Sequence, residues 1–278
     1  MHVHRPTLEV SEIPSFDSNR NLGVFNQLYK FHHARRFRWL QKKTTSIRKP
    51  AISVLELGCN DARSISYIPV PITRYVGFDA GWRSGTKNGH PYGLEAARQR
   101  YRGIPEFEFH RSDRYEDVER VRGGFDVAVV LETFEYLRPN ELERYVSVLA
   151  EKLNDSGCIY STMPNEKGLP LLLKALGSRL SRVPRSEYTL RQLANGVFGR
   201  MHKVPRKPFG RKGFDYSAVA NIARRHFQRI QLEAVEPAFA PVPLSLNVGM
   251  VACKEPPPRN QPQEEIADAR LGFQGALE

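Results

Sequence analysis

Residues 51–63 read Ala-Ile-Ser-Val-Leu-Glu-Leu-Gly-Cys-Asn-Asp-Ala-Arg. The apolar, β-branched run over 52–57 predicts a strand that stops at Gly58, and a small polar loop then leads into a predicted helix near 61–67. A second apolar run, at 75–79, closes on Asp79, twenty-one residues after Gly58. A strand, a tight turn, a helix and a strand that ends in an acid predict a nucleoside site. In such a site the backbone approaches the ligand at the turn, and the acid accepts the ribose hydroxyls.

Strands and helices alternate along the rest of the chain, which predicts an α/β protein with a doubly wound, mostly parallel seven-stranded sheet. The further predicted strands are 107–110, 125–131, 158–163, 229–235 and 244–253, and the predicted helices are 21–43, 94–101, 139–153 and 217–227. The last two strands are joined too tightly for a crossover helix, so we expect them to form an antiparallel pair. The turn-rich stretch 81–93 is expected to be irregular.

The composition indicates one globular domain over 21–253, preceded by a flexible arm (1–20) and followed by a disordered, proline-rich tail (254–278). No apolar run approaches the about 20 residues of a membrane helix. Cys59, Cys158 and Cys253 lie far apart in the sequence, each in or beside a predicted strand. We therefore expect buried free thiols rather than a metal site or a disulfide, which fits a reducing cytoplasm.

The net charge of +12 is concentrated in one segment. Residues 166–212 hold twelve Lys and Arg against two Glu, so this segment carries ten of the twelve excess charges. It leaves the predicted strand 158–163 where ligands of such sheets bind, so we expect a basic helical lid over the substrate. Its charge favours an anionic acceptor or a peripheral contact with an anionic membrane. RNA is disfavoured, because no RNA-binding motif accompanies the charge.

Two common nucleotide sites are excluded. A dinucleotide fingerprint needs glycines at three spaced positions, and this chain has Gly58, Asn60 and Arg63 there. A phosphate loop ending in Gly-Lys-Ser/Thr does not follow any predicted strand.

The stretch 54–165 resembles the class I S-adenosylmethionine-dependent methyltransferases. The run Val54-Leu-Glu-Leu-Gly-Cys-Asn-Asp-Ala62 is similar to that family's first motif, and Gly77-Phe-Asp79 is similar to its second. Ser112-Asp113 matches the acid after the third strand, and 125–137 matches the fourth-strand motif. The resemblance implies S-adenosylmethionine as cofactor, with binding roles for Glu56, Gly58, Asn60, Asp79, Asp113 and Glu132. Asn60 and Ala62 stand where the family usually has glycine. Asn tolerates a positive φ, whereas Ala62 adds a methyl near the expected ligand.

The resemblance also implies a type of reaction. Met163-Pro164-Asn165 resembles the corresponding run of small-molecule and glycan O-methyltransferases, which implies O-methylation of a polar or anionic small molecule, glycan or lipid-linked intermediate. His202, His33 and Glu135 are the candidate acid/base residues, although surface histidines are common. No metal is expected. Two alternatives stay open: an RNA methyltransferase, and a non-catalytic partner protein that retains a degenerate methyltransferase fold.

Overall fold

The computed structural model of the chain describes residues 24–87, 89–180 and 188–254; over 24–33 and 178–180 it describes the backbone alone. The predicted arm 1–20, and all of the predicted tail after Lys254, lie outside these residues. Within them, no helix combines the length and the apolar character needed to cross a bilayer.

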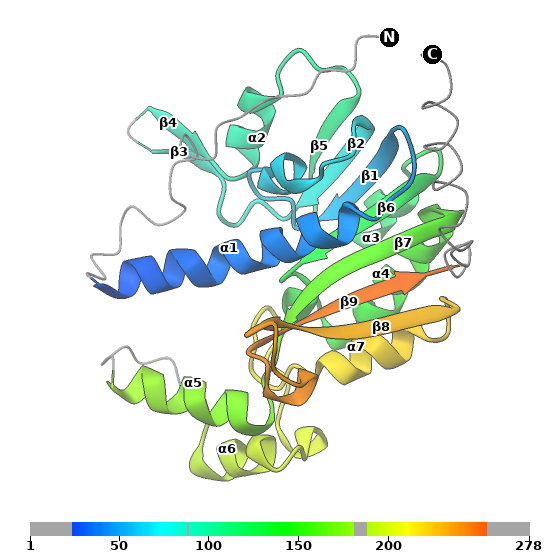
Figure 1. Cartoon of the computed structure of the whole chain (residues 1–278). Coiled ribbons are helices and arrows are strands. Elements are labelled where there is room, and N and C mark those ends of the chain that lie inside the picture. Colours follow the sequence, from blue (N-terminus) through cyan, green and yellow to red (C-terminus); the bar gives the residue numbers. More distant parts are fainter. Residues whose placement is uncertain (1–23, 88, 181–187, 255–278) are drawn as a thin grey trace, which may run out of the picture.

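Seven strands form one sheet in the order β5-β2-β1-β6-β7-β9-β8 (Figure 1). The strands are β1 (Ile52–Leu57), β2 (Ile72–Asp79), β5 (Phe107–Arg111), β6 (Phe125–Leu131), β7 (Leu153–Pro164), β8 (Arg229–Glu236) and β9 (Asn247–Cys253). Neighbouring strands from β5 to β7 are parallel, whereas β9 runs antiparallel to both β7 and β8. The predicted fold class is therefore confirmed, including the antiparallel strands at the C-terminal end.

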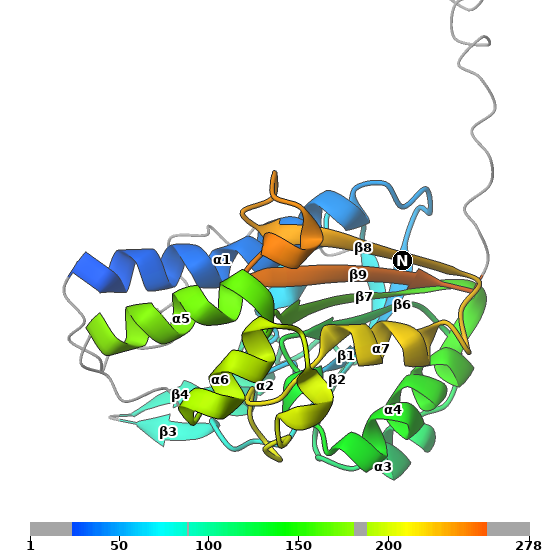
Figure 2. The same cartoon turned by 90° about the horizontal axis from the view of Figure 1, so that it is seen from below.

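The alternating side chains of the strands build a core on each face of the sheet. In β6, Val127 and Val129 join one core, whereas Ala128 and Val130 join the other. Figure 2 shows helices on both faces. The core with Val130 contains residues of α3 (Tyr115–Glu119), α4 (Pro139–Lys152) and α7 (Tyr216–Ala223). The core with Val129 contains residues of α1 (Val24–Thr44), the 3₁₀ helix η2 (Arg63–Tyr67) and α2 (Leu94–Arg100).

Helix α1 lies across the antiparallel edge of the sheet. The Trp39 ring covers Gly249 of β9 so closely that a Cβ there would lie 2.4 Å from it. The Trp39 indole N–H donates to Glu233 of β8 over 3.3 Å, and Lys43 pairs with the same carboxylate. Arg36 lies about one turn before Trp39 in α1. The contacts of Trp39 and Lys43 therefore place Arg36 near the carboxyl ends of the central strands.

Three short elements differ from the sequence expectation. The stretch 81–93, expected to be irregular, contains a small hairpin of β3 (Gly85–Lys87) and β4 (His90–Tyr92). Residues 63–67 form a 3₁₀ helix rather than an α-helix, and α3 had no predicted counterpart. All three are too short to leave a hydrophobic period in the sequence.

The expectation of free thiols is wrong for two of the three cysteines. Cys158 and Cys253 are opposite each other across β7 and β9, with Cα atoms 4.1 Å apart, and form a disulfide. They are 95 residues apart in the sequence, and only the antiparallel pairing of the strands brings them together. Cys59 is a free, buried thiol, as predicted. The expected reducing cytoplasm rested on free thiols and loses that support, because disulfides persist mainly in oxidising compartments.

The basic segment 166–212 leaves the end of β7 and forms helices, as expected of a lid. Its described elements are α5 (Gly168–Leu180), α6 (Leu190–Val197) and the 3₁₀ helix η4 (Met201–Lys203). Helix α6 begins with a capping box, in which Thr189 and Gln192 satisfy each other's backbone N–H groups. The segment then returns to the sheet through Phe209 and Arg211, which reach the cavity described next.

Candidate functional site

A cavity of about 690 Å³ opens at the carboxyl ends of the parallel strands. Four of the parallel strands contribute a residue at or just after their carboxyl ends: Gly58 after β1, Asp79 at the end of β2, Asp113 after β5 and Glu132 after β6. Side chains from outside the sheet complete the lining, among them Arg36, Trp82, Arg114, Tyr136, Arg138, Tyr145, Phe209 and Arg211. This edge is where open parallel sheets bind their ligands, so the structure places five of the six predicted cofactor residues at one site, the exception being Glu56.

The Gly58 turn needs glycine for two physical reasons. Gly58 has φ +72°, a conformation that side chains with a Cβ rarely adopt. A Cβ on it would also lie 2.1 Å from Oγ1 of Thr133, a hydroxyl that donates to the Leu57 carbonyl over 3.1 Å. Asn60 has φ 48°, so the residue that replaces a glycine here adopts the left-handed conformation that Asn tolerates.

Ala62 does not obstruct the cavity, contrary to the expectation from the sequence. It also has a positive φ, 53°, but it is fully buried in the core with Val129 and is not a lining residue. The Ala62 methyl group therefore packs in the core behind the Gly58 loop and does not project into the cavity. The missing glycine leaves the ligand space unchanged.

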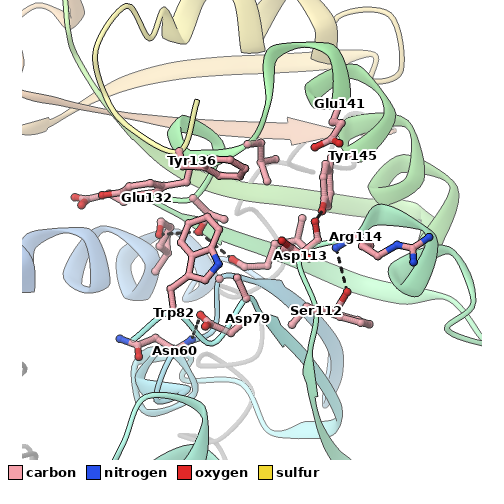
Figure 3. A pocket seen from close by; sticks show the side chains of 18 of the residues that line it. Asn60, Asp79, Trp82, Ser112, Asp113, Arg114, Glu132, Tyr136, Glu141 and Tyr145 are labelled. Carbon is pink, nitrogen blue, oxygen red and sulfur yellow. Dashed lines mark hydrogen bonds between the residues drawn. The ribbon is translucent and has the colours of Figure 1, made fainter. Parts of the chain in front are cut away.

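Asp79 points into the cavity while its carboxylate holds the surrounding loops. Its Oδ2 accepts the Asn60 backbone N–H at 3.0 Å, and its Oδ1 accepts that of Gly81 at 2.7 Å. Each oxygen keeps a second lone pair for a ligand, because a carboxylate offers about four acceptor positions. In the view of Figure 3, Asn60 and Asp79 lie next to the Trp82 indole, with Tyr136 beyond it.

Asp113 follows β5, the strand next to β2 in the sheet. Its backbone carbonyl accepts the Tyr145 hydroxyl at 2.5 Å (Figure 3), and Ser112 before it donates to Asp117. The side chain of Asp113 lines the cavity and remains exposed to it. It is therefore available to a ligand, and its implied contact with the cofactor stays a prediction.

Glu56 is not among the residues that line the cavity, so its implied role in cofactor binding stays a prediction. It is buried behind the Gly58 loop, where the hydroxyls of Tyr75, at 2.5 Å, and Ser64 donate to its Oε2. Burial raises the pKa of Glu56 to about 8, in spite of these two hydrogen bonds. Its carboxyl group is therefore largely protonated at neutral pH. Its hydrogen bonds with Tyr75 and Ser64 stabilise the packing behind the Gly58 turn.

Glu132 anchors a charged cluster at the end of β6. Its carboxylate contacts Arg36 at 3.1 Å and Arg211 at 2.8 Å, and the Asn247 amide donates to it at 3.2 Å. It lines the cavity, but its oxygens are engaged by guanidinium groups from α1 and the basic segment. It thus fixes two cations at the cavity wall.

Glu135 lies under this cluster and not in the cavity. It is fully buried, its carboxylate lies 3.6 Å from Nε of Arg211, and neither carboxyl oxygen has a hydrogen-bond partner among the described residues. Burial raises the pKa of Glu135 to about 7, with Arg211 opposing the shift and Glu132 adding to it. The following residue, Tyr136, is the one that faces the cavity.

Of the predicted histidines, the structure can place only His202, and it does not bring this residue to the cavity. His202 is exposed on η4 and is not a lining residue, and no described histidine lines the cavity. The side chain of His33 lies outside the described residues. Sequence reasoning missed Arg36, Trp82 and Phe209, which come from segments without a motif. Trp82 and Phe209 meet edge to face at 5.2 Å, so the basic segment contacts the loop after β2.

Comparison with known proteins gives structural matches alone. No family model matches the chain, and no curated protein sequence matches it. The magnesium protoporphyrin IX methyltransferase of Synechocystis PCC 6803 with bound SAH is similar in structure, with a TM-score of 0.52 and 13% identity over 86% of this chain and 91% of that one. The N-methyltransferase NodS of Bradyrhizobium japonicum WM9, in complex with S-adenosyl-L-homocysteine, has a TM-score of 0.48 and 12% identity over 82% of this chain and 88% of that one.

The likeness to the Synechocystis enzyme agrees with the strand order and with the antiparallel strands at the C-terminal end of the sheet. The chain has the fold of the class I S-adenosylmethionine-dependent methyltransferases.

Proposed function

We propose that the protein is an S-adenosylmethionine-dependent methyltransferase that methylates an oxygen of an anionic small molecule, most simply a carboxylate. The observation that carries the proposal is the lining of the cavity at the carboxyl ends of the strands. Asp79 and Asp113 lie at the ends of the neighbouring strands β2 and β5, whereas Arg36 and Arg211 lie around Glu132 at the end of β6.

The residues present fit the cofactor. Asp79 retains acceptor capacity for two ribose hydroxyls, and Asp113 can accept the adenine amino hydrogens. The Gly58 turn presents backbone rather than side chain to the methionine end. When bound, S-adenosylmethionine supplies a methyl group activated by its sulfonium.

The remaining wall is suited to an anion. Arg36 and Arg211 share one carboxylate, that of Glu132, while burial raises the pKa of Glu135 below them and so favours its uncharged form. The pair therefore keeps excess positive charge beside the cavity. Arg138, also in the lining, is half exposed, and its closest acid, Glu141, is 3.5 Å away. Guanidinium groups bind carboxylates through two parallel hydrogen bonds.

A carboxylate acceptor also fits a cavity that has no histidine among its described lining residues. An alcohol or phenol has to lose its proton in the reaction, which favours a positioned general base. No described histidine lines the cavity, Glu135 is buried below it, and Glu132 is engaged by two arginines. A carboxylate arrives ionised, so the protein has only to hold it in line with the methyl group.

The cofactor half of the proposal is tested by calorimetry with S-adenosylhomocysteine. We expect the wild-type protein to bind it and Asp79→Ala to bind about 150-fold more weakly. Two hydrogen bonds to a charged acceptor at about 1.5 kcal/mol each give this factor. The matched control is Asp155→Ala, an exposed acid near the start of β7, which should bind normally. No binding by the wild type would favour the non-catalytic alternative, and normal affinity in Asp79→Ala would refute the ribose assignment.

The acceptor half is tested with methyl-labelled cofactor and a panel of carboxylic acids, alcohols and amines. A methyl ester releases labelled methanol in mild alkali, whereas methyl ethers and methylamines are stable. We expect alkali-labile product, and a large fall in kcat/KM for Arg138→Ala with unchanged affinity for S-adenosylhomocysteine. Alkali-stable product alone would refute the carboxylate. Salt-dependent tRNA binding together with methylated RNA would instead favour the RNA methyltransferase.

A further inference from the structure

Two exposed aromatic side chains line the cavity and contact each other. Trp82, after β2, is 58% exposed, and Phe209, in the basic segment, is 44% exposed. Their rings meet edge to face, with centroids 5.2 Å apart. Such a contact uses the edge of one ring and one face of the other, so Trp82 keeps at least one ring face free of Phe209. Figure 3 shows the indole among the side chains that line the cavity, where a ligand can reach it.

The backbone just before Trp82 is held on both sides. The Gly81 N–H donates to the Asp79 carboxylate at 2.7 Å, and the Gly81 carbonyl accepts from the Arg111 guanidinium at 3.0 Å. Gly81 has φ +72°, and a Cβ on it would lie 2.2 Å from Nε of Arg111, so this close fit requires glycine. The indole is therefore presented by a fixed turn, as a preorganised binding site requires.

Phe209 has a backbone conformation that a bulky residue rarely adopts. Its φ is +56°. Among the described residues, four that are not glycine have a positive φ, and three of these line the cavity: Asn60, Glu132 and Phe209. Strained residues of this kind cluster at functional sites. Glycine would adopt the same φ without strain, so the presence of phenylalanine indicates that its ring is needed here.

The loop that carries Phe209 is closed and anchored. The Lys207 N–H donates to the Lys212 carbonyl at 3.0 Å, which closes the loop. The guanidinium of Arg206, just before it, donates to the backbone carbonyl of Glu135 at 2.5 Å. Glu135 belongs to the short 3₁₀ helix that follows β6. The phenyl ring is therefore anchored to the turn after β6, whereas the indole is anchored at the end of β2.

A cation lies beside the same aromatic pair. The Arg138 guanidinium lies over the Phe209 ring, with its Cζ 5.3 Å from the ring centroid. With 5.2 Å and 5.3 Å to the same Phe209 centroid, the Trp82 ring and the Arg138 guanidinium are at most about 10.5 Å apart. An aromatic carboxylate can span this distance. Stacked rings have centroids about 4.5–7 Å apart, and a guanidinium nitrogen lies about 2.8 Å from a carboxylate oxygen.

We propose that Trp82 and Phe209 form an aromatic subsite for the methyl acceptor, and that the acceptor is an aromatic carboxylate. Its ring stacks on the free face of Trp82 and contacts Phe209, while its carboxylate pairs with Arg138. The inference rests on the proposed function for the anionic group and adds the ring. The cofactor's adenine fits this subsite less well. Its implied partner, Asp113, follows β5, which β2 and β1 separate from β6 in the sheet.

Calorimetry with the full chain, in the presence of S-adenosylhomocysteine, tests the subsite through binding. The probes are benzoate and cyclohexanecarboxylate, which carry the same anion on an aromatic and on a saturated six-membered ring. We expect the wild type to bind benzoate at least about fivefold more tightly, the lower end for two ring contacts. The double variant Trp82→Leu with Phe209→Leu keeps apolar side chains and should lose this preference. Its affinity for S-adenosylhomocysteine should stay within about threefold of the wild-type value.

The matched control is Phe239→Leu, which changes a 92% exposed phenylalanine outside the cavity and should keep the preference for benzoate. The subsite is overturned if the wild type binds both acids equally, or if the double variant keeps the preference. It is also overturned if the double variant binds S-adenosylhomocysteine more than about tenfold more weakly, because the rings would then hold the cofactor.

Benzyl alcohol and cyclohexylmethanol separate this inference from the proposed function. Suppose that neither acid binds, but the wild type prefers the aromatic alcohol and the double variant does not. The aromatic subsite is then supported, and the carboxylate acceptor is refuted. Equal binding of the two acids has the opposite meaning, because the carboxylate then stands without the subsite. If none of the four probes binds the wild type, the subsite is overturned as well.

Discussion

Replacing Glu56 by Gln should flatten the dependence of stability on pH. The carboxyl group of Glu56 is buried, and its pKa rises from an ordinary value of 4.5 to about 8 in the folded protein. Between these values the unfolded chain has lost the proton that the folded chain keeps. The folded state thus binds more protons, and the free energy of unfolding falls as pH rises through this window.

The size of the effect follows from the two pKa values. With pKa values of 4.5 and about 8, keeping the proton on Glu56 costs about 1 kcal/mol of stability at pH 5 and about 4 kcal/mol at pH 8. The wild type should therefore lose about 3 kcal/mol more than Glu56→Gln over this interval. Glutamine does not titrate, and its carbonyl can still accept the Tyr75 and Ser64 hydroxyls.

Urea unfolding of both proteins at pH 5 and pH 8 measures this difference. Other titrating groups are common to the two proteins and cancel in the comparison. If the stability gap between variant and wild type is the same at both pH values, the buried, protonated Glu56 is refuted. Calorimetry with S-adenosylhomocysteine adds a second readout. Because Glu56 lies outside the cavity, the affinity of Glu56→Gln should stay within about threefold of the wild-type value. If Glu56 instead formed a charged hydrogen bond with the ligand, the substitution would weaken binding more than about tenfold.

Two further predictions concern stability. Gly58→Ala should lower the free energy of unfolding by about 2–4 kcal/mol, through its left-handed φ and the clash with Thr133. A second change, Thr133→Ala, should recover at least about 1 kcal/mol of this loss; additive effects in denaturant titrations would contradict the clash. Reduction of the Cys158–Cys253 disulfide, which links positions 95 residues apart, should cost about 2–4 kcal/mol. An unchanged unfolding midpoint with reductant would show that the disulfide is absent.

Local pattern was sufficient for most of the elements in the sheet. The predicted strand 125–131 coincides with β6, and the predicted strand 107–110 misses only the last residue of β5. Continuous apolar runs of this length have one stable environment, a strand buried on both faces. The turn at Gly58 and the acid at Asp79 could be recognised from the sequence, because each lies at the end of a strand that the apolar pattern predicts.

The tertiary structure decided what depends on distant segments meeting. Sequence alone could not place Glu56 behind the loop rather than beside the ligand, since both positions follow from the same strand end. Arg36 and Arg211 reach one carboxylate from segments far apart in the sequence, and Cys158 meets Cys253 only through antiparallel pairing. Hydrophobic periodicity records which face of an element is buried, but not which partner buries it. Local sequence patterns therefore determine the strands and helices of the fold, whereas the charge of the cavity wall depends on which distant segments pack together.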